Sequence, residues 1–196
     1  MTHSKPLLAG LVPANATPAG RLAINTFMAV LGTAILAASA KAHVPFYPVP
    51  MTMQPMVVLL FGAAYGWRLG GATVALYLME GALGLPVFSG TPEKGIGLAY
   101  MAGPTGGYLV GFCFAAMVVG WLTERGFDRS LVKLAVAMTL GSATYYVLGV
   151  AWLSHLIGAD KAVAFGLLPF LLGDAVKIVL ASLVVAGARK GLAKRV

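Results

Sequence analysis

The sequence predicts an all-α, polytopic membrane protein with six transmembrane helices. Of its 196 residues, 59% are hydrophobic and only 10% are charged, whereas soluble domains carry about 25% charged residues. The mean hydropathy is +0.87, and the apolar residues form runs close to the roughly 20 residues that a spanning helix needs. These runs fill the chain, so we expect one membrane domain and no separate soluble domain.

Proline, glycine and clusters of charge divide the apolar sequence into candidate spans. The second and third spans are short and meet in a tight turn around Trp67 and Arg68. We expect a tail of residues 1–20 before the membrane domain of residues 21–190, and a basic tail of residues 191–196 after it. The candidate spans are 22–41, 52–67, 69–85, 104–122, 131–154 and 164–188.

The positions of Lys and Arg predict the orientation of these spans, because basic residues concentrate in cytoplasmic segments. With the N-terminus inside, ten of the 14 basic residues lie on the inner side, and Lys177 lies within a span. Only Lys41, Lys94 and Lys161 lie on the outer side. We therefore expect both termini in the cytoplasm. The net charge of +8 reflects these flanks, and no nucleic-acid partner is expected.

Two of the outer connections are too irregular to be simple links. Residues 44–50 read Val-Pro-Phe-Tyr-Pro-Val-Pro, and their prolines favour extended backbone. Residues 86–103 are rich in glycine and include Pro86 and Pro92. Non-helical backbone at membrane depth is tolerated only when it is buried in protein or lines a cavity. We therefore expect these two connections to wall a ligand pocket that opens outward.

Three charged side chains lie inside the predicted spans, away from their ends: Glu80, Asp174 and Lys177. Such groups are costly in a membrane and are candidates for function. Asp174 and Lys177 are three positions apart, so they share a helix face and can pair or contact a polar ligand together. Alternatively, Asp174 caps the last helix after a break near Pro169 and Gly173, and Lys177 neutralises it. Glu80 contacts the ligand or pairs with a polar group of another span.

Polar and aromatic side chains gather around the same outer connections. Thr52 either contacts a ligand or caps the helix that follows, whereas Gln54, with two donors and an acceptor, suits recognition of a cyclic amide or urea. The aromatic residues are interfacial anchors or walls of the pocket. They are Tyr47, Phe88, Tyr100 and Tyr108.

Several familiar catalytic motifs are absent from the sequence. It contains no Gly-x-x-x-x-Gly-Lys-Ser/Thr phosphate loop, no His-Glu-x-x-His motif and no Gly-x-Ser-x-Gly elbow. The single Cys113 excludes an internal disulfide and a multi-cysteine metal site. A membrane enzyme acting on lipid or isoprenoid would need carboxylate clusters such as Asp-x-x-Asp, and the six acidic residues are scattered singly. We expect no enzyme, no bound metal and no ATPase activity in this chain.

Small residues recur four positions apart, a spacing that permits close helix packing. Packing within the bundle explains most of these pairs. The pair on the first span could instead dock a separate membrane subunit. The pairs are Ala34/Ala38, Gly62/Gly66, Gly66/Gly70 and Gly107/Gly111.

Four motifs, in order between residues 22 and 188, resemble the BioY family, the substrate-capture (S) components of energy-coupling factor (ECF) biotin transporters of prokaryotes. The resemblance implies a six-helix, S-component-like bundle in the inner membrane that binds biotin from outside with high affinity. The motifs are Val49-Pro-Met-Thr-Met-Gln54, Gly81-Ala-Leu-Gly-Leu-Pro-Val-Phe88, Gly103-Pro-Thr-Gly-Gly-Tyr-Leu109 with Gly111-Phe112, and Leu168-Pro-Phe-Leu-Leu-Gly-Asp-Ala-Val-Lys177.

The resemblance also implies partners. In the full transporter an S component associates with a transmembrane coupling (T) protein and two ATP-binding-cassette ATPases, in agreement with the missing phosphate loop. The Ala34/Ala38 pair matches the small-residue pattern by which S components meet the coupling protein. Some family members are thought to work alone or as homo-oligomers in the membrane lipid, which is one alternative. An S component for another vitamin is the other.

For the ligand itself, the resemblance implies biotin and no further cofactor. Lys177 suits the valerate carboxylate or the ureido oxygen, Asp174 suits the ureido N–H groups, and Gln54 suits either end. Some relatives carry an asparagine shortly after the Pro-Val-Phe stretch, where this chain has Ser89-Gly90-Thr91. We expect Ser89 and Thr91 to supply the polar contact there.

Overall fold

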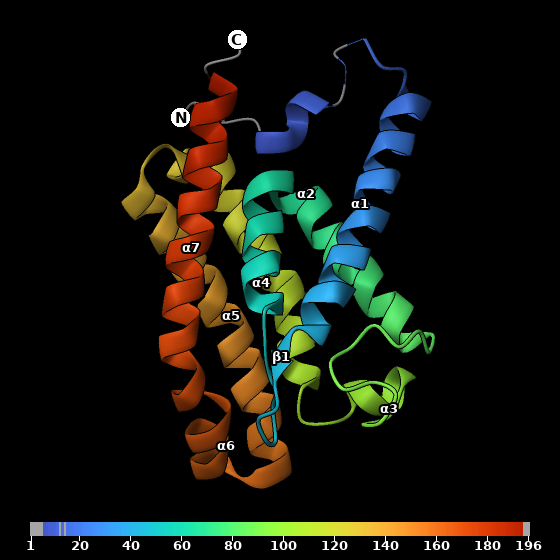
Figure 1. The fold of residues 1–196 in the computed structure, drawn as a ribbon, viewed down its shortest axis with the longest axis vertical. Helices are drawn as coiled ribbons and strands as arrows, with labels where there is room; N and C mark the ends of the chain where they lie inside the picture. Colours follow the sequence, from blue (N-terminus) through green and yellow to red (C-terminus); the bar gives the residue numbers. More distant parts are fainter. Residues whose placement is uncertain (1–5, 12, 14, 194–196) are drawn as a thin grey trace.

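The protein forms a bundle of long helices, which confirms the predicted all-α membrane fold (Figure 1). In this computed structural model, residues 6–11, 13 and 15–193 are described, so parts of both predicted tails, including Lys5, Lys194 and Arg195, lie outside the described residues. The first long helix begins and the last one ends at the same end of the bundle, here called the terminal end. The opposite end, here called the loop end, carries most of the irregular backbone.

Helix α1, Pro18–Lys41, lies along the side of the bundle. The Thr17 side chain accepts a hydrogen bond from the Gly20 N–H at 3.1 Å, and proline in the first turn lacks the N–H that would have no partner there. A short 3₁₀ helix, Leu7–Leu11, precedes α1. Ala34 and Ala38 lie on the exposed face of α1.

Helix α2, Gln54–Ala82, runs from the loop end to the terminal end and folds back at Gly66 (Figure 1). Gly66 has φ 78° and ψ 175°, a conformation that essentially only glycine adopts. The two arms account for the predicted second and third spans and for the turn expected beside Trp67. The Trp67 N–H, at the start of the second arm, donates to the Glu124 side chain at 3.2 Å.

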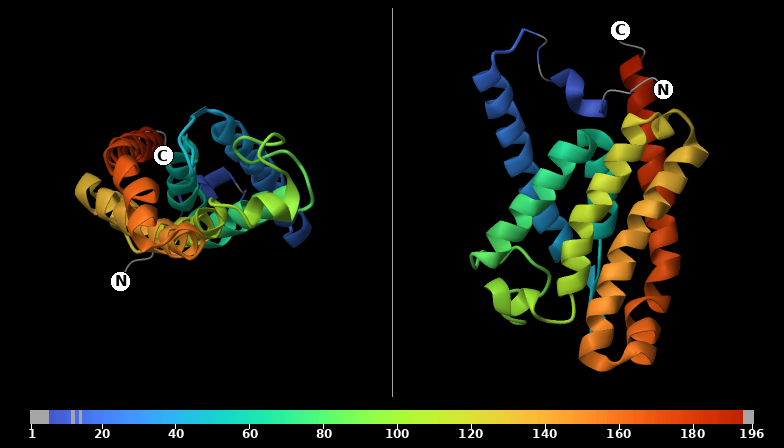
Figure 2. Two further views of the ribbon diagram at one scale, coloured as in Figure 1. Left: turned by 90° about the horizontal axis from the view of Figure 1, so that it is seen from below. Right: turned by 180° about the vertical axis from the view of Figure 1, so that it is seen from behind.

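Helices α4, Gly106–Glu124, and α5, Leu131–Ile157, run side by side (Figure 2). A Cβ at Gly107 would collide with the Leu148 carbonyl of α5, and one at Gly111 with the Tyr145 backbone. Glycine at these positions therefore lets the two helix backbones approach closely. The Gly107/Gly111 pair therefore allows close packing within the bundle, as its spacing predicts. A 3₁₀ turn, Phe127–Arg129, links the helices and brings Asp128 to an ion pair with Arg189.

Helices α6, Ala159–Gly166, and α7, Leu168–Ala193, complete the bundle. The expected break in the sixth span is present, but it falls at Leu167, two residues before Pro169, and not at Gly173. Proline is tolerated in the first turn of a helix, so α7 starts just before Pro169. Asp174 is therefore inside α7, and the alternative that it caps this helix is wrong.

The loop end is built from two irregular connections and the short helix α6. A two-stranded antiparallel ribbon, β1 His43–Val44 with β2 Met51–Thr52, pairs His43 with Thr52 and Val44 with Met51. A connection of residues 83–96, here called the 83–96 loop, leads from α2 to the short helix α3, Gly97–Met101. The ribbon and the 83–96 loop are the two irregular connections that the prolines and glycines predict.

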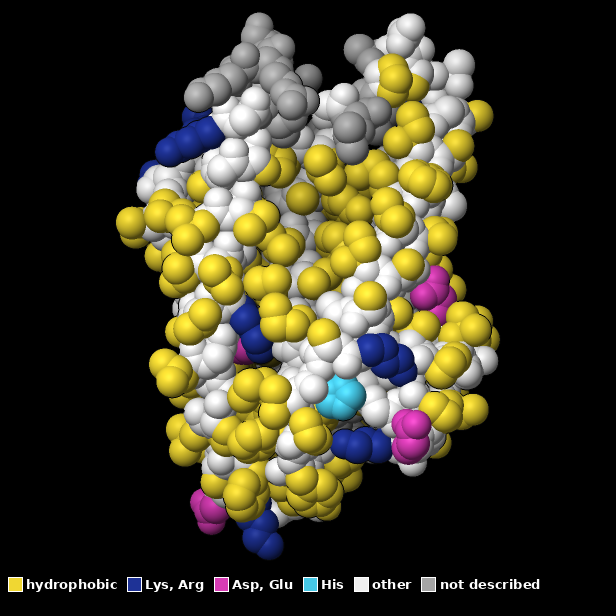
Figure 3. Space-filling model, in the orientation of Figure 1, with side chains coloured by type: hydrophobic (Ala, Val, Ile, Leu, Met, Phe, Trp, Pro, Cys, Tyr) yellow, Lys and Arg dark blue, Asp and Glu magenta, His cyan; other side chains and the backbone are white. Residues whose placement is uncertain are grey.

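Five helical segments of the described chain are long and apolar enough to cross a membrane. Because α2 folds back on itself, these segments provide the six predicted passes. Apolar side chains cover most of the face seen in Figure 3, whereas the charged side chains visible there gather mainly in its lower half, toward the loop end. The protein is a multi-pass membrane protein.

The conformation of Gly66 gives a test of the α2 fold-back. Gly66→Ala forces a side chain into a glycine-only conformation and against the Glu124 carboxylate, so we expect a loss of about 1–3 kcal/mol and a lower unfolding temperature in detergent. Gly187→Ala is the control, because a Cβ there meets no atom within 4 Å. Equal unfolding temperatures for the two variants would contradict the prediction.

Candidate ligand-binding site

A cavity lies at the loop end, between the ribbon, the first arm of α2, α4, α5 and α7. The space in it that the centre of a water-sized sphere can occupy is about 50 Å³, so the cavity is narrow in this structure. Its lining is mostly apolar and aromatic, with a few polar groups. The lining residues are Val49, Pro50, Thr52, Gln54, Pro55, Ser89, Tyr100, Thr105, Tyr108, Leu109, Phe112, Tyr145, Tyr146, Gly166, Phe170, Asp174 and Lys177.

One wall of the cavity carries the buried pair Asp174 and Lys177. The Lys177 ammonium donates to Asp174 Oδ1 at 2.8 Å, and the two residues are 8% and 4% exposed. From α5, the hydroxyls of Tyr145 and Tyr146 donate to Asp174 Oδ2 at 2.6 and 2.7 Å. A carboxylate has about four acceptor sites, so three are used and one remains. An ammonium has three donors, and among the described residues Asp174 is the one recorded partner of Lys177.

The opposite wall carries Gln54 in a fixed orientation. Its Nε2 donates to the Tyr77 hydroxyl at 2.8 Å, and that hydroxyl donates its single proton to the Val87 carbonyl at 3.0 Å. Because Tyr77 has no second proton, it can only accept from Gln54, which fixes the amide nitrogen on the Tyr77 side. The amide oxygen of Gln54 is therefore left as an acceptor for a ligand in the cavity.

Two smaller polar groups also line the cavity. Thr52 Oγ1 accepts from the Gln54 N–H, the first N–H of α2, at 3.2 Å, and Thr52 also lines the site; the N-cap position itself is Met53. Ser89 is 3% exposed, and its hydroxyl has no hydrogen-bond partner among the described residues. A buried hydroxyl without a partner costs free energy, so Ser89 is a ready contact for a polar ligand group.

Aromatic rings form much of the remaining wall. Tyr108 is buried and donates its hydroxyl proton to the Gly166 carbonyl at 2.8 Å, which ties α4 to the end of α6. Tyr100, on α3, stacks on Phe88 with ring centroids 5.1 Å apart, and burial raises the pKa of its phenol. Tyr100 is therefore a neutral side chain at physiological pH. Tyr47, by contrast, is 87% exposed and lies outside the cavity lining.

Seven of the ten residues expected at the ligand line this cavity, and three do not. Glu80 accepts a hydrogen bond from Thr33 of α1 at 2.9 Å, so it pairs with a neighbouring span. Phe88 is fully buried behind Tyr100, and Thr91 is held by Lys41. The seven lining residues are Thr52, Gln54, Ser89, Tyr100, Tyr108, Asp174 and Lys177.

Two residues that hold the Asp174 carboxylate, Tyr145 and Tyr146, are not predicted from the sequence. Adjacent tyrosines within an apolar helix resemble core or interfacial residues, and their partner lies on another helix. The unusual charge of Asp174 within a span was the available signal, because a buried carboxylate needs donors. No group of three or more His, Cys, Asp or Glu residues that could hold a metal occurs among the residues described.

The fold and the cavity together define a class: an integral membrane protein that holds a small ligand with both polar and apolar parts at one end of its bundle. Comparison with known proteins narrows this class. The profile of the BioY family matches residues 13–194. The chain belongs to the BioY family.

Relatives in this family are transporters. The chain is 36% identical over 159 residues to the biotin transporter BioY of Thermotoga maritima, covering 81% of this chain and 91% of that protein. It is 38% identical over 146 residues to the biotin transporter BioY of Rhizobium etli, covering 70% and 76%. The family is thus one of transporters, and the protein is not an enzyme.

A solved structure supports the fold. The S-component for biotin from an ECF-type ABC transporter superposes with a TM-score of 0.72, covering 89% of this chain and 95% of that one, at 24% sequence identity. At 24% identity this structural similarity is evidence for the fold alone. The S-component-like bundle predicted from the motifs is confirmed.

The tyrosine pair on Asp174 provides a test of the site. Tyr145→Phe removes a hydrogen bond to a buried carboxylate, so we expect the free energy of unfolding to fall by about 1–3 kcal/mol, measured by thermal unfolding in detergent. Tyr65→Phe is the control, because its hydroxyl donates to the neutral Met28 carbonyl at 3.2 Å. A loss in Tyr65→Phe as large as that in Tyr145→Phe would argue against a charge-assisted network.

Proposed function

We propose that the protein binds biotin at the loop-end cavity and serves biotin uptake as the substrate-binding S component of an ECF-type transporter. The observation that carries the proposal is the buried Asp174–Lys177 pair at one wall of a mainly apolar cavity, in a member of the BioY family. The relatives in this family are named biotin transporters. Biotin has both an apolar part and polar groups, and a mainly apolar cavity with a few polar groups can accommodate such a molecule.

The donors and acceptors of the cavity match the groups of biotin. Its ureido ring has two N–H donors and one carbonyl acceptor, its thiophane ring is apolar, and its valerate tail ends in a carboxylate. Gln54 Oε1 and the remaining acceptor site of Asp174 suit the ureido N–H groups. The free N–H donors of Lys177 and the Ser89 hydroxyl suit the ureido oxygen or the carboxylate. Tyr100, Tyr108, Phe112 and Phe170 enclose the apolar ring.

The proposed orientation places both termini in the cytoplasm of a prokaryotic cell and the loop end outside. Its support is the excess of Lys and Arg at the terminal end. In this orientation the cavity faces the outside, where biotin is captured.

ATP hydrolysis on other chains would supply the energy for uptake, because this chain has no phosphate loop. The proposed partners are a transmembrane coupling protein and ABC ATPases. The exposed Ala34 and Ala38 of α1 would let a partner helix approach closely. A protein that works without these partners, alone or as a homo-oligomer, and an S component for another vitamin are the alternatives.

Binding of radiolabelled biotin to the purified protein tests the proposal. We expect a dissociation constant in the nanomolar range and no competition from other vitamins. Lys177→Ala and Asp174→Asn each remove part of the buried polar pair, so we expect each to weaken binding at least tenfold while the protein stays folded.

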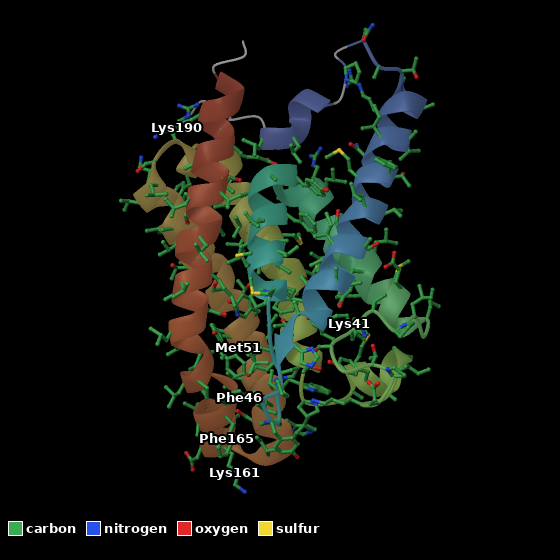
Figure 4. The ribbon with its side chains drawn as sticks, viewed as in Figure 1. Lys41, Phe46, Met51, Lys161, Phe165 and Lys190 are labelled. Atoms are coloured by element: carbon green, nitrogen blue, oxygen red, sulfur yellow. The ribbon has the colours of Figure 1, made fainter. Side chains whose placement is uncertain are left out.

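Lys190→Ala is the matched control for these variants. It removes a lysine from the same helix but at the terminal end, far from the cavity (Figure 4), and we expect binding to be unchanged. Full affinity in both Lys177→Ala and Asp174→Asn would refute the site. Stronger competition by another vitamin than by unlabelled biotin would refute the ligand.

Labelling of single cysteines tests the orientation. In a Cys113→Ser background, the exposed Lys94 of the 83–96 loop and the exposed Arg129 of the α4–α5 connection are each replaced by cysteine. We expect a membrane-impermeant maleimide added to intact cells to label the Lys94→Cys variant and to label the Arg129→Cys variant only after the cells are broken. The reverse labelling pattern would show that the protein has the opposite orientation in the membrane and would refute the proposal.

A further inference from the structure

The side chain of Lys41 joins the end of α1 to the 83–96 loop. Its ammonium donates to the Phe88 carbonyl, the Thr91 carbonyl and Thr91 Oγ1, each at 3.0 Å. These contacts use all three N–H donors of the ammonium. Figure 4 shows Lys41 at the lower end of α1, beside this loop.

A lysine in the last turn of a helix usually favours the carbonyls and dipole of its own helix. Lys41 instead bonds backbone carbonyls that are 47 and 50 residues away in the sequence. Lysine loses considerable side-chain entropy when it is held in one geometry, and an exposed lysine is ordinarily mobile. Three simultaneous contacts therefore mark Lys41 as an anchor of the loop.

The segment that Lys41 anchors forms part of the cavity wall. Phe88, whose carbonyl Lys41 holds, is fully buried and stacks behind the lining residue Tyr100. The next residue, Ser89, lines the cavity, and its hydroxyl has no hydrogen-bond partner in the described part of the chain. On the other side, the Tyr77 hydroxyl bonds the Val87 carbonyl. Residues 87–91 are thus held at both ends, from α2 by Tyr77 and from α1 by Lys41.

We propose that Lys41 is a positioning residue for the ligand: it holds the 83–96 loop closed over the cavity and thereby slows the release of bound biotin. The inference rests on the proposed function, since it concerns the same cavity. Lys41 itself is outside the cavity lining and acts through Phe88, Ser89 and Thr91. Loss of the anchor would leave the loop attached mainly through Tyr77, and the loop would open more often.

Stopped-flow or filter-binding kinetics with biotin would test this role. We expect Lys41→Met to raise the dissociation rate constant of biotin about tenfold, the loss that corresponds to roughly one charge-assisted hydrogen bond. Lys41→Arg keeps a charged, multivalent donor, so we expect it to restore most of the slow release. Thr91→Val removes one Lys41 contact and the 2.7 Å hydrogen bond from Thr91 Oγ1 to the Phe88 carbonyl, but it leaves the two carbonyl contacts of Lys41 in place, so we expect a smaller increase.

Lys161→Met is the matched control. Lys161 is an exposed lysine of α6 at the loop end, away from Lys41 (Figure 4), so its loss removes the same positive charge from the surface that meets the anionic ligand. Any effect of charge on association appears in both variants, whereas faster release belongs to Lys41→Met alone. Equal dissociation rates in Lys41→Met, Lys161→Met and the parent would overturn the proposal.

Hydrogen exchange of the ligand-free protein gives a second readout that does not depend on biotin. We expect faster amide exchange in residues 87–95 of Lys41→Met, at an unchanged unfolding temperature, and parental exchange in Lys161→Met. Unchanged exchange in Lys41→Met would overturn the anchor. A parent protein that fails to bind biotin but shows the expected exchange pattern would refute the proposed function and leave the anchor supported.

Discussion

The buried carboxylate of Asp174 sets the strongest constraint on this structure. An isolated charge in an apolar interior costs several kcal/mol, so the surrounding helices must provide donors. Two of these donors, Tyr145 and Tyr146, are consecutive on α5, where neighbouring side chains point about 100° apart. Both reach the same oxygen only if Asp174 faces the groove between their directions. The network therefore fixes the rotation of α7 against α5, and with it the position of Lys177 at the cavity.

The same requirement governs the irregular backbone of the loop end. Carbonyl groups in loops and at the ends of helices have no intrahelical donor and take one from elsewhere in the protein where they are buried. Side chains from the helices provide them: Tyr77 for Val87, Lys41 for Phe88, Tyr108 for Gly166 and Trp152 for Gly103. These bonds satisfy the backbone and also attach each irregular piece to a rigid helix. The loops of the cavity wall are therefore held in fixed positions relative to the helices.

The sequence was sufficient for features that depend on composition and local spacing. The six passes, the turn beside Trp67 and Arg68 and the irregular connections follow from the apolar runs, the interruptions between them, and the prolines and glycines. Features that depend on distant partners were not accessible. Glu80 reads as a candidate contact until Thr33, 47 residues away, is seen to donate to it. The break before α7 was misplaced because Pro169 is equally compatible with ending a helix and with starting one.

Three polar groups of the cavity belong to separate elements: Gln54 to α2, Ser89 to the 83–96 loop, and Lys177 to α7. Each side chain is held by its own element, so the three polar groups have a fixed arrangement in space around the cavity. Only one enantiomer of a chiral ligand can contact all three groups at once, because its mirror image would present one of its polar groups to the wrong wall. For the proposed chiral ligand, contact with all three groups would therefore favour one enantiomer, even though both have the same size, charge and polarity.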